Sequence, residues 1–213
     1  MNASLATIIQ MRMERTAAAL RKNNMEADVV ATAADVVPLV RSLLQKGDVV
    51  AAGGGLSLAE TGVLDLLRSG DYQFLDRAAP GLDEEEIGKL HRAAFSSDCF
   101  FASSNAVTEH GELYNVDGNA NRVSAITFGP KRVILVVGYN KIVPDLAAAE
   151  LRVKRIAAPA NAVRFASKTP CTATGVCADC KSPGRICCTY VIHKYQRVAG
   201  RIHVILVGEQ LGY

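Results

Sequence analysis

Two short apolar runs, residues 99–102 (Cys-Phe-Phe-Ala) and 133–137 (Val-Ile-Leu-Val-Val), constrain the fold of this chain most strongly. Each has the length of a β-strand and contains no charged residue, which is typical of a strand buried on both faces. Within residues 98–143, the segment between the runs is rich in small polar side chains but returns repeatedly to apolar ones such as Leu113 and Ile126. We therefore expect a binding site where these strands end, in preference to a decorated loop.

Strand-like and helix-like patterns alternate along the rest of the chain. Short stretches rich in β-branched and apolar residues predict strands over residues 26–32, 48–52, 72–75, 186–195 and 201–207. Apolar residues near helical spacing predict helices over residues 5–23, 36–45, 57–68, 83–97 and 145–156. This alternation is typical of an α/β protein with a mainly parallel sheet, because parallel strands need long crossover connections.

The predicted fold class is a three-layer, mainly parallel, Rossmann-like sheet with helices on both faces. Nothing in the composition divides the 213 residues cleanly, so we expect a single α/β domain over residues 1–213. Residues 168–190 hold five of the six cysteines and are expected to form a cysteine-rich annex. The last two predicted strands, 186–195 and 201–207, are expected to pair as a β-hairpin around Ala199 and Gly200.

The charge balance argues against a nucleic-acid-binding protein. The chain has 24 basic and 21 acidic residues and no tryptophan, so it lacks both a dense basic surface and a stacking platform. Residues 1–10 lack the basic start and long apolar core of a signal peptide, and no apolar run approaches the roughly 18 residues needed to cross a membrane. We expect a cytoplasmic protein without a membrane partner, and the sequence leaves its oligomeric state open.

Three consecutive glycines, Gly53, Gly54 and Gly55, follow one predicted strand and precede the helix at 57–68. Such a turn lets the backbone approach a ligand closely, and its free N–H groups favour an anion. It is not a Walker loop, and Leu58 stands where a dinucleotide fingerprint needs its third glycine, so no nicotinamide or flavin motif is present. The alternative is a tight turn without a ligand.

Polar residues at the ends of the predicted strands supply the rest of the expected site. Arg122 suits a bidentate grip on a phosphate or carboxylate group, whereas Lys131 and Lys141 are expected at solvated positions. Asp117 either shapes a turn or aims its carboxylate into the crevice. The expected ligand-binding residues are Gly53, Gly54, Gly55, Ser57, Ser104, Asn105, Thr108, Asp117, Asn121 and Arg122.

Three motifs together resemble the lactate-utilisation (LUD) domain family over nearly the whole chain. They are Gly-Gly-Gly-Leu-Ser-Leu-Ala-Glu-Thr-Gly at 53–62, Ser-Ser-Asn-Ala-Val-Thr-Glu-His-Gly-Glu-Leu at 103–113 and Asn-Val-Asp-Gly-Asn-Ala-Asn-Arg-Val at 115–123. The resemblance implies a fold like that of glucosamine-6-phosphate deaminase, ribose-5-phosphate isomerase and the CoA-transferases. It also implies a role beside bacterial lactate oxidation, with iron–sulphur redox proteins as partners.

Glu109 is the expected catalytic residue, because it precedes a glycine turn among hydroxyl and amide side chains and could act as a base or nucleophile. The similar CoA-transferases attack an acyl-CoA with a glutamate that precedes an Asn-Gly pair, and the run from Glu109 to Leu113 is similar in form. The alternative is a turn carboxylate without chemistry. We expect residues 53–57 and 105–111 to line one pocket, and Glu109→Gln to abolish any turnover without unfolding the protein.

Two functions from different classes remain open. The first is an accessory or redox-linked protein of lactate or organic-acid utilisation, which binds a small anionic metabolite in a crevice at the strand ends. The second is an enzyme, similar to a CoA-transferase or a sugar-phosphate isomerase, that uses Glu109. The cysteines favour the first function, and the polar crevice favours the second.

Four cysteines, Cys171, Cys177, Cys180 and Cys187, have the spacing C-x5-C-x2-C-x6-C. In a reducing compartment this spacing suggests metal ligation more than structural disulfides. We expect a [4Fe–4S] cluster in preference to zinc, because four-cysteine zinc sites commonly use two Cys-x-x-Cys pairs. Bare thiols, or disulfides formed after metal loss, are the alternatives.

Overall fold

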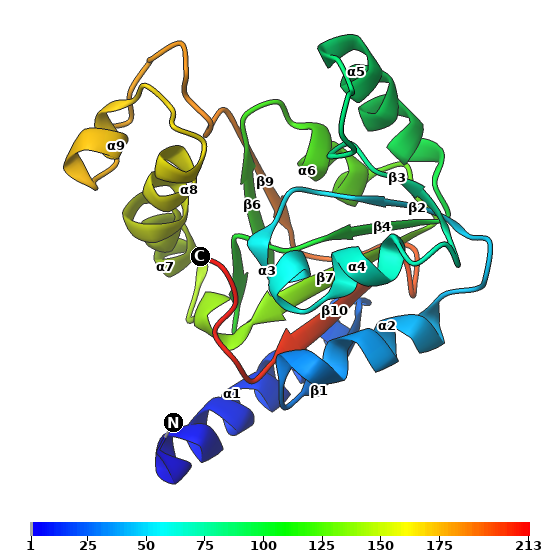
Figure 1. Ribbon diagram of the computed structural model, residues 1–213. Helices are drawn as coiled ribbons and strands as arrows, with labels where there is room; N and C mark the ends of the chain where they lie inside the picture. Colours follow the sequence, from blue (N-terminus) through cyan, green and yellow to red (C-terminus); the bar gives the residue numbers. More distant parts are fainter. Residues whose placement is uncertain (1) are drawn as a thin grey trace.

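The computed structural model describes residues 2–213 and contains two β-sheets (Figure 1). All strand pairs of the main, six-stranded sheet are parallel, which confirms the predicted α/β class. Its strands, in spatial order, are β1 (Glu26–Val30), β10 (Ile202–Val207), β7 (Arg132–Gly138), β4 (Cys99–Ala102), β2 (Val49–Ala52) and β3 (Gln73–Leu75). The second sheet contains β8 (Ile142–Val143), β5 (Ala106–Thr108), β6 (Leu113–Asp117) and β9 (Thr189–His193).

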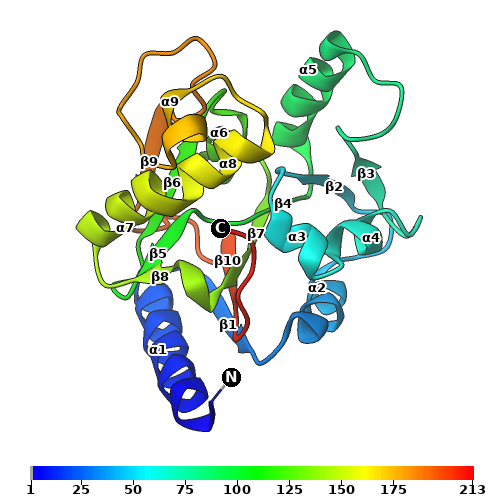
Figure 2. The same ribbon diagram turned by 60° about the vertical axis from the view of Figure 1, so that its left-hand side comes forward.

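Helices cover the main sheet on both faces and extend over the second sheet (Figures 1 and 2). The α-helices are α1 (Ala3–Lys22), α2 (Val36–Leu43), α3 (Leu56–Glu60), α4 (Val63–Leu67), α5 (Glu84–Ala93), α6 (Asn121–Thr127), α7 (Leu146–Arg152), α8 (Ala158–Arg164) and α9 (Pro170–Thr174). The shorter turns are the 3-10 helices η1 (Ala33–Asp35), η2 (Ala94–Ser96) and η3 (Tyr139–Lys141), and the π-helix η4 (Val153–Ala157).

The central strands bury side chains on both faces, as their uninterrupted apolar sequence predicts. On β4, Phe100 and Ala102 pack with α1 and α6, whereas Cys99 and Phe101 pack with α2, α3 and α4. Successive side chains of a strand point to opposite faces, so an apolar run with no polar position fits only a strand covered twice. This double cover makes the sheet a rigid base for the loops at its carboxyl ends.

The predicted C-terminal β-hairpin is wrong. Strand β9 pairs antiparallel with β6 in the second sheet, whereas β10 lies parallel between β1 and β7 in the main sheet. Residues 202–207 are all buried, so this strand satisfies its apolar pattern inside the main sheet and not at the edge of a hairpin. The strands β9 and β10, although consecutive in the sequence, therefore belong to different sheets.

Two predicted helices differ in extent from the observed ones. The helix predicted over residues 57–68 breaks into α3 and α4 at Gly62, whose φ of 74° lies in the left-handed region that glycine adopts without strain. The helix predicted to end at residue 156 continues through η4 into α8. Pro159 lies in the first turn of α8, inside this continued helix, where it has no N–H to donate to the preceding turn, and a π-helical turn lies immediately before it. None of the helices within residues 2–213 is long and apolar enough to cross a membrane.

Candidate functional site

A cavity of about 380 Å³ opens at the carboxyl ends of the main-sheet strands. Gly54 and Gly55 reach it after β2, Ser103 reaches it after β4, and Lys141 reaches it at the end of η3, which follows β7. Ligands of open parallel sheets bind outside these strand ends, because the loops there converge on one crevice. Helix α8 forms part of the opposite wall, and both ribbon views show the end of the chain between α8 and α3 (Figures 1 and 2).

Seven of the ten expected ligand-binding residues line this cavity: Gly54, Gly55, Ser104, Asn105, Asp117, Asn121 and Arg122. Gly53 does not line the cavity, and a Cβ atom at this position would lie 3.1 Å from the side chain of Arg122. Ser57 is fully buried and bonds to Lys141. Thr108 lies elsewhere, with its hydroxyl donating to Glu112.

Arg122 organises the wall of the cavity. Its Nε donates to Asp117 Oδ1 (2.9 Å), and its other N–H groups reach the Oδ1 atoms of Asn115 (2.7 Å) and Asn105 (2.8 Å) and two backbone carbonyls, including that of Ser103 (2.9 Å). A guanidinium has five N–H donors, and protein acceptors already occupy all of them. We conclude that Arg122 fixes the loop after β4 to strand β6, and that its donors are committed to the protein.

Arg77 and Arg164 carry positive charge into the cavity without a carboxylate partner. Within residues 2–213, neither guanidinium lies within ion-pair distance of an aspartate or glutamate. Arg77 has the ring of His91 as its hydrogen-bonding neighbour (3.2 Å), and Arg164 donates to the Gly54 carbonyl (3.1 Å) and to Asn161 (3.0 Å). Burial lowers the pKa of Arg77; the nearby carboxylate of Asp117 raises it, and the charge of Arg164 lowers it.

Gly54 permits this arrangement of the two arginines. A Cβ atom at this position would collide with the guanidinium of Arg77, so any other residue would push Arg77 away from the turn. The glycine turn recognised in the sequence thus brings two cations together at the cavity. The two like charges repel each other, Asp117 on the cavity wall offsets part of the positive charge of Arg77, and an anionic ligand would relieve the repulsion further.

Lys141 lies at the inner end of the cavity and is only 4% exposed. Its Nζ donates to Ser57 Oγ (2.8 Å) and Ser103 Oγ (3.0 Å), and no carboxylate within residues 2–213 forms an ion pair with it. Burial, followed by the nearby charge of Arg152, lowers the pKa of Lys141 to about 7. The solvated position expected for this lysine is therefore wrong.

Glu109 does not line the cavity. Strand β5 turns away from the main sheet to join the second sheet, and it carries Glu109 towards α1. There the carboxylate forms ion pairs with Arg12 (2.7 Å) and Arg15 (3.5 Å). Of the two segments expected to share a pocket, residues 54–56 and Asn105 lie together in the cavity, whereas residues 106–111 do not.

The four cysteines gather around one small void of about 10 Å³, beside the larger cavity. The residues Ala158, Arg185, Ile186 and Cys187 belong to both walls, so the two spaces are neighbours. All six cysteines are free thiols. As the side chains stand, no three His, Cys, Asp or Glu residues within 2–213 are grouped closely enough to hold a metal ion. The thiols thus share a location but do not have the geometry of a metal site.

Sequence reasoning did not identify Arg77 or Arg164 as cations of the cavity, and it placed Lys141 in solvent. Arg77 and Lys141 follow β3 and β7 by two and three residues, so the rule that ligands bind at strand ends could have identified them. Arg164 ends α8, and no local pattern distinguishes it from a solvated helix terminus.

A family model for the LUD domain matches residues 13–207. The chain belongs to the LUD domain family. This confirms the resemblance of the sequence motifs and relates the protein, in general terms, to lactate utilisation. No curated protein matches this LUD domain.

Among solved structures, the LUD domain is similar to the crystal structure of a DUF162 family protein from Deinococcus radiodurans. The TM-score is 0.53 and the sequence identity is 16%, over 93% of this chain and 98% of that chain. At this identity the similarity supports the shared fold and does not extend to a ligand.

Proposed function

We propose that this LUD domain binds a small anionic metabolite, an organic acid or a phosphorylated compound, in the cavity at the strand ends. The observation that supports the proposal is the pair Arg77 and Arg164, which both contact Gly54 and lack a carboxylate partner among the described residues. Guanidinium groups bind carboxylates and phosphates through paired N–H donors. A cavity of about 380 Å³ suits a metabolite of modest size.

In this proposal the protein serves lactate or organic-acid utilisation as an accessory or redox-linked component, beside iron–sulphur partner proteins. The alternative, an enzyme that uses Glu109 as in the CoA-transferases, is less favoured, because two arginines of α1 hold that carboxylate outside the cavity. Catalysis by Glu109 would require a different surface of the molecule.

Ligand-dependent stabilisation tests the proposal. Lactate, pyruvate, phosphate, sugar phosphates and acyl-CoA compounds would each be titrated while thermal unfolding is followed. A ligand that binds only the folded state stabilises it by about 2.7 kcal/mol at one hundred times its Kd. We expect at least one anion of the series to raise the unfolding temperature in a concentration-dependent manner.

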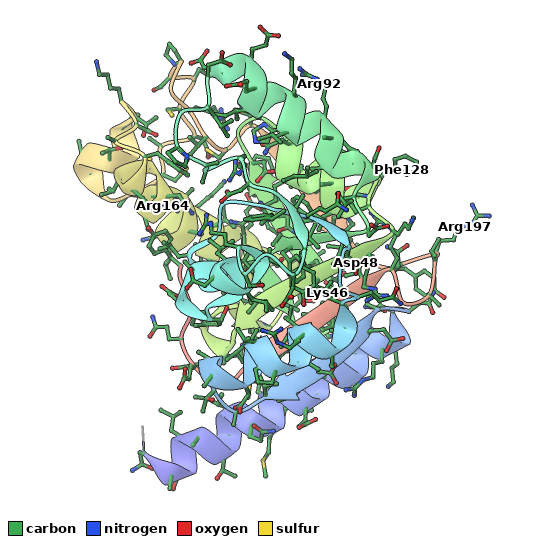
Figure 3. All side chains as sticks on the ribbon, turned by 45° about the vertical axis from the view of Figure 1, so that its right-hand side comes forward. Lys46, Asp48, Arg92, Phe128, Arg164 and Arg197 are labelled. Atoms are coloured by element: carbon green, nitrogen blue, oxygen red, sulfur yellow. The ribbon has the colours of Figure 1, made fainter. Side chains whose placement is uncertain are left out.

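Charge-removing variants locate the binding site. Arg77→Gln and Arg164→Gln should each weaken the stabilisation by the anion, because each removes one of the unpaired guanidinium groups. Arg197→Gln is the matched control, since Arg197 is exposed and lies far across the molecule from Arg164 (Figure 3). Equal losses in all three variants would mean nonspecific attraction, and the absence of any stabilising anion would contradict the proposal.

We also propose that Cys171, Cys177, Cys180 and Cys187 bind a metal centre, as a [4Fe–4S] cluster or as zinc. Their common position around one void supports this, together with the preference of both centres for cysteine thiolates. The present arrangement does not meet the geometry of such a centre, so binding would require the loop to draw the thiols closer. We assign no chemical step in the neighbouring cavity to this metal centre.

A further inference from the structure

The side chain of Lys141 has surroundings that a merely structural lysine rarely has. It is buried at the carboxyl end of the main sheet and lines the cavity, and its hydrogen-bonding partners are the hydroxyl groups of Ser57 and Ser103. A buried ammonium is normally paired with a carboxylate, because leaving it unpaired in a low-dielectric interior is costly. Here the charge is not compensated, which favours the neutral amine.

The charged groups around Lys141 act mainly in the same direction. Arg152 on α7 and Arg122 on α6 repel a positive charge at Lys141, whereas Glu60 on α3 attracts one. The remaining charged residues that line the cavity are Arg77, Asp117, Arg164 and Arg185. Asp117 is neutralised by its ion pair with Arg122 (2.7 Å). Burial is the main cause, and with this balance of charges it lowers the pKa of Lys141 to about 7, so a substantial fraction of these side chains are neutral amines at neutral pH.

We propose that Lys141 is a catalytic residue whose amine forms an imine with a carbonyl carbon of the anion bound in this cavity. The inference rests on the proposed anion binding, because Arg77 and Arg164 would hold the anionic end of the same molecule. The substrate class is then a carbonyl-bearing acid or phosphate, such as a 2-oxo acid or an aldehyde phosphate. An amine desolvated beside other cations is the form in which lysine acts as a nucleophile.

The step balances without a further reactant. The lone pair of Lys141 Nζ attacks the carbonyl carbon, the carbonyl oxygen takes up a proton, and the resulting carbinolamine loses one water molecule to leave a C=N bond. Two protons move from nitrogen to the departing oxygen in this sequence. Ser103 Oγ, 3.0 Å from Nζ and on the cavity wall, is placed to pass them. Ser57 is fully buried and holds the amine from the other side.

Reductive trapping tests the inference directly. The protein would be incubated with glyoxylate, pyruvate or pyridoxal 5′-phosphate, reduced with borohydride, and analysed by intact mass and peptide mapping. At pH 7 an ordinary lysine, with a pKa near 10.4, is neutral in only roughly one molecule in 2,500. We therefore expect an adduct on Lys141 at least about tenfold faster than on Lys46, which is 84% exposed and labelled in Figure 3.

The pH dependence of labelling, together with two variants, shows whether Lys141 reacts because its amine is neutral or only because probes can reach it. Labelling of Lys141 should rise through pH 7 and level off above it, as the amine loses its proton. Ser103→Ala should slow the labelling while leaving the site intact. Lys141→Arg should remove the adduct at position 141 and leave that on Lys46 unchanged. Circular dichroism would confirm that both variants are folded.

The outcomes distinguish this inference from the proposed function. If anions stabilise the protein but every carbonyl probe labels Lys141 no faster than Lys46, the imine inference is overturned and anion binding stands. If neutral aldehydes label Lys141 as fast as glyoxylate does, and Arg77→Gln changes nothing, the amine chemistry is supported and the anion site fails. Selective labelling of Lys141 by anionic carbonyl probes that Arg77→Gln weakens supports both.

Discussion

Replacement of Lys141 by methionine should change how the stability of the protein depends on pH. In the folded protein, burial lowers the pKa of Lys141 from 10.5 to about 7. One unit of pKa corresponds to about 1.36 kcal/mol, so burying the charged form costs about 5 kcal/mol relative to the unfolded chain. Methionine has a similar length and no charge, so Lys141→Met removes this cost.

Proton binding to Lys141 in the folded and unfolded states determines whether the stability of the protein rises or falls with pH. Between pH 7 and pH 10.5 the unfolded chain holds the proton on Lys141 and the folded protein does not. The free energy of unfolding contributed by this group therefore rises with pH across that window, and it is constant below it. From pH 6 to pH 9 the rise is about 3 kcal/mol. In Lys141→Met this rise disappears, so its stability relative to wild type should be highest at pH 6 and fall by that amount at pH 9.

Equilibrium unfolding in guanidinium chloride measures this difference. The chain contains no tryptophan, so far-ultraviolet circular dichroism is the suitable signal, with a reductant present to keep the cysteines free. Lost hydrogen bonds to Ser57 and Ser103 lower the stability of the variant at every pH and cancel from the comparison. Lys46→Met is the control for an exposed lysine. Parallel pH profiles for wild type and Lys141→Met would refute the reasoning.

Three further predictions concern the core, the N-terminal helix and the cysteines. Phe101→Ala should lower the free energy of unfolding by about 3–5 kcal/mol in the same assay, because this side chain of β4 is fully buried against α2, α3 and α4. A loss below about 1 kcal/mol would contradict the cover of both faces of the sheet. Glu109→Gln should lower the free energy of unfolding by no more than about 1 kcal/mol, because the partly exposed ion pairs with Arg12 and Arg15 are weak. It should leave the stabilisation by anions unchanged, and loss of that stabilisation would show that Glu109 contributes to the binding site. Protein purified anaerobically should contain stoichiometric iron and sulphide, or zinc. Cys177→Ser should remove this metal, whereas Cys99→Ser, the control at a buried core position, should retain it. Metal-free wild-type protein would contradict the proposal.

The alternation of strands and helices, and hence the fold class, could be predicted from the sequence because burial on both faces leaves a local signature. The uninterrupted apolar runs of β4 and β7 can satisfy their side chains only inside a covered sheet. The glycine turn at Gly54 and the polar residues after β4 were likewise identified, since parallel strands bring their carboxyl ends to one edge.

Strand partners and side-chain direction were decided by the tertiary structure. Residues 189–193 and 202–207 have similar local patterns but join different sheets, because pairing depends on distant strands that the local sequence does not encode. The same dependence turns Glu109 towards α1 and buries Lys141, two residues whose local context predicted the reverse. Electrostatic environment is set by neighbours from separate segments, so the uncompensated charges of the cavity emerge only once the sheet has brought those segments together.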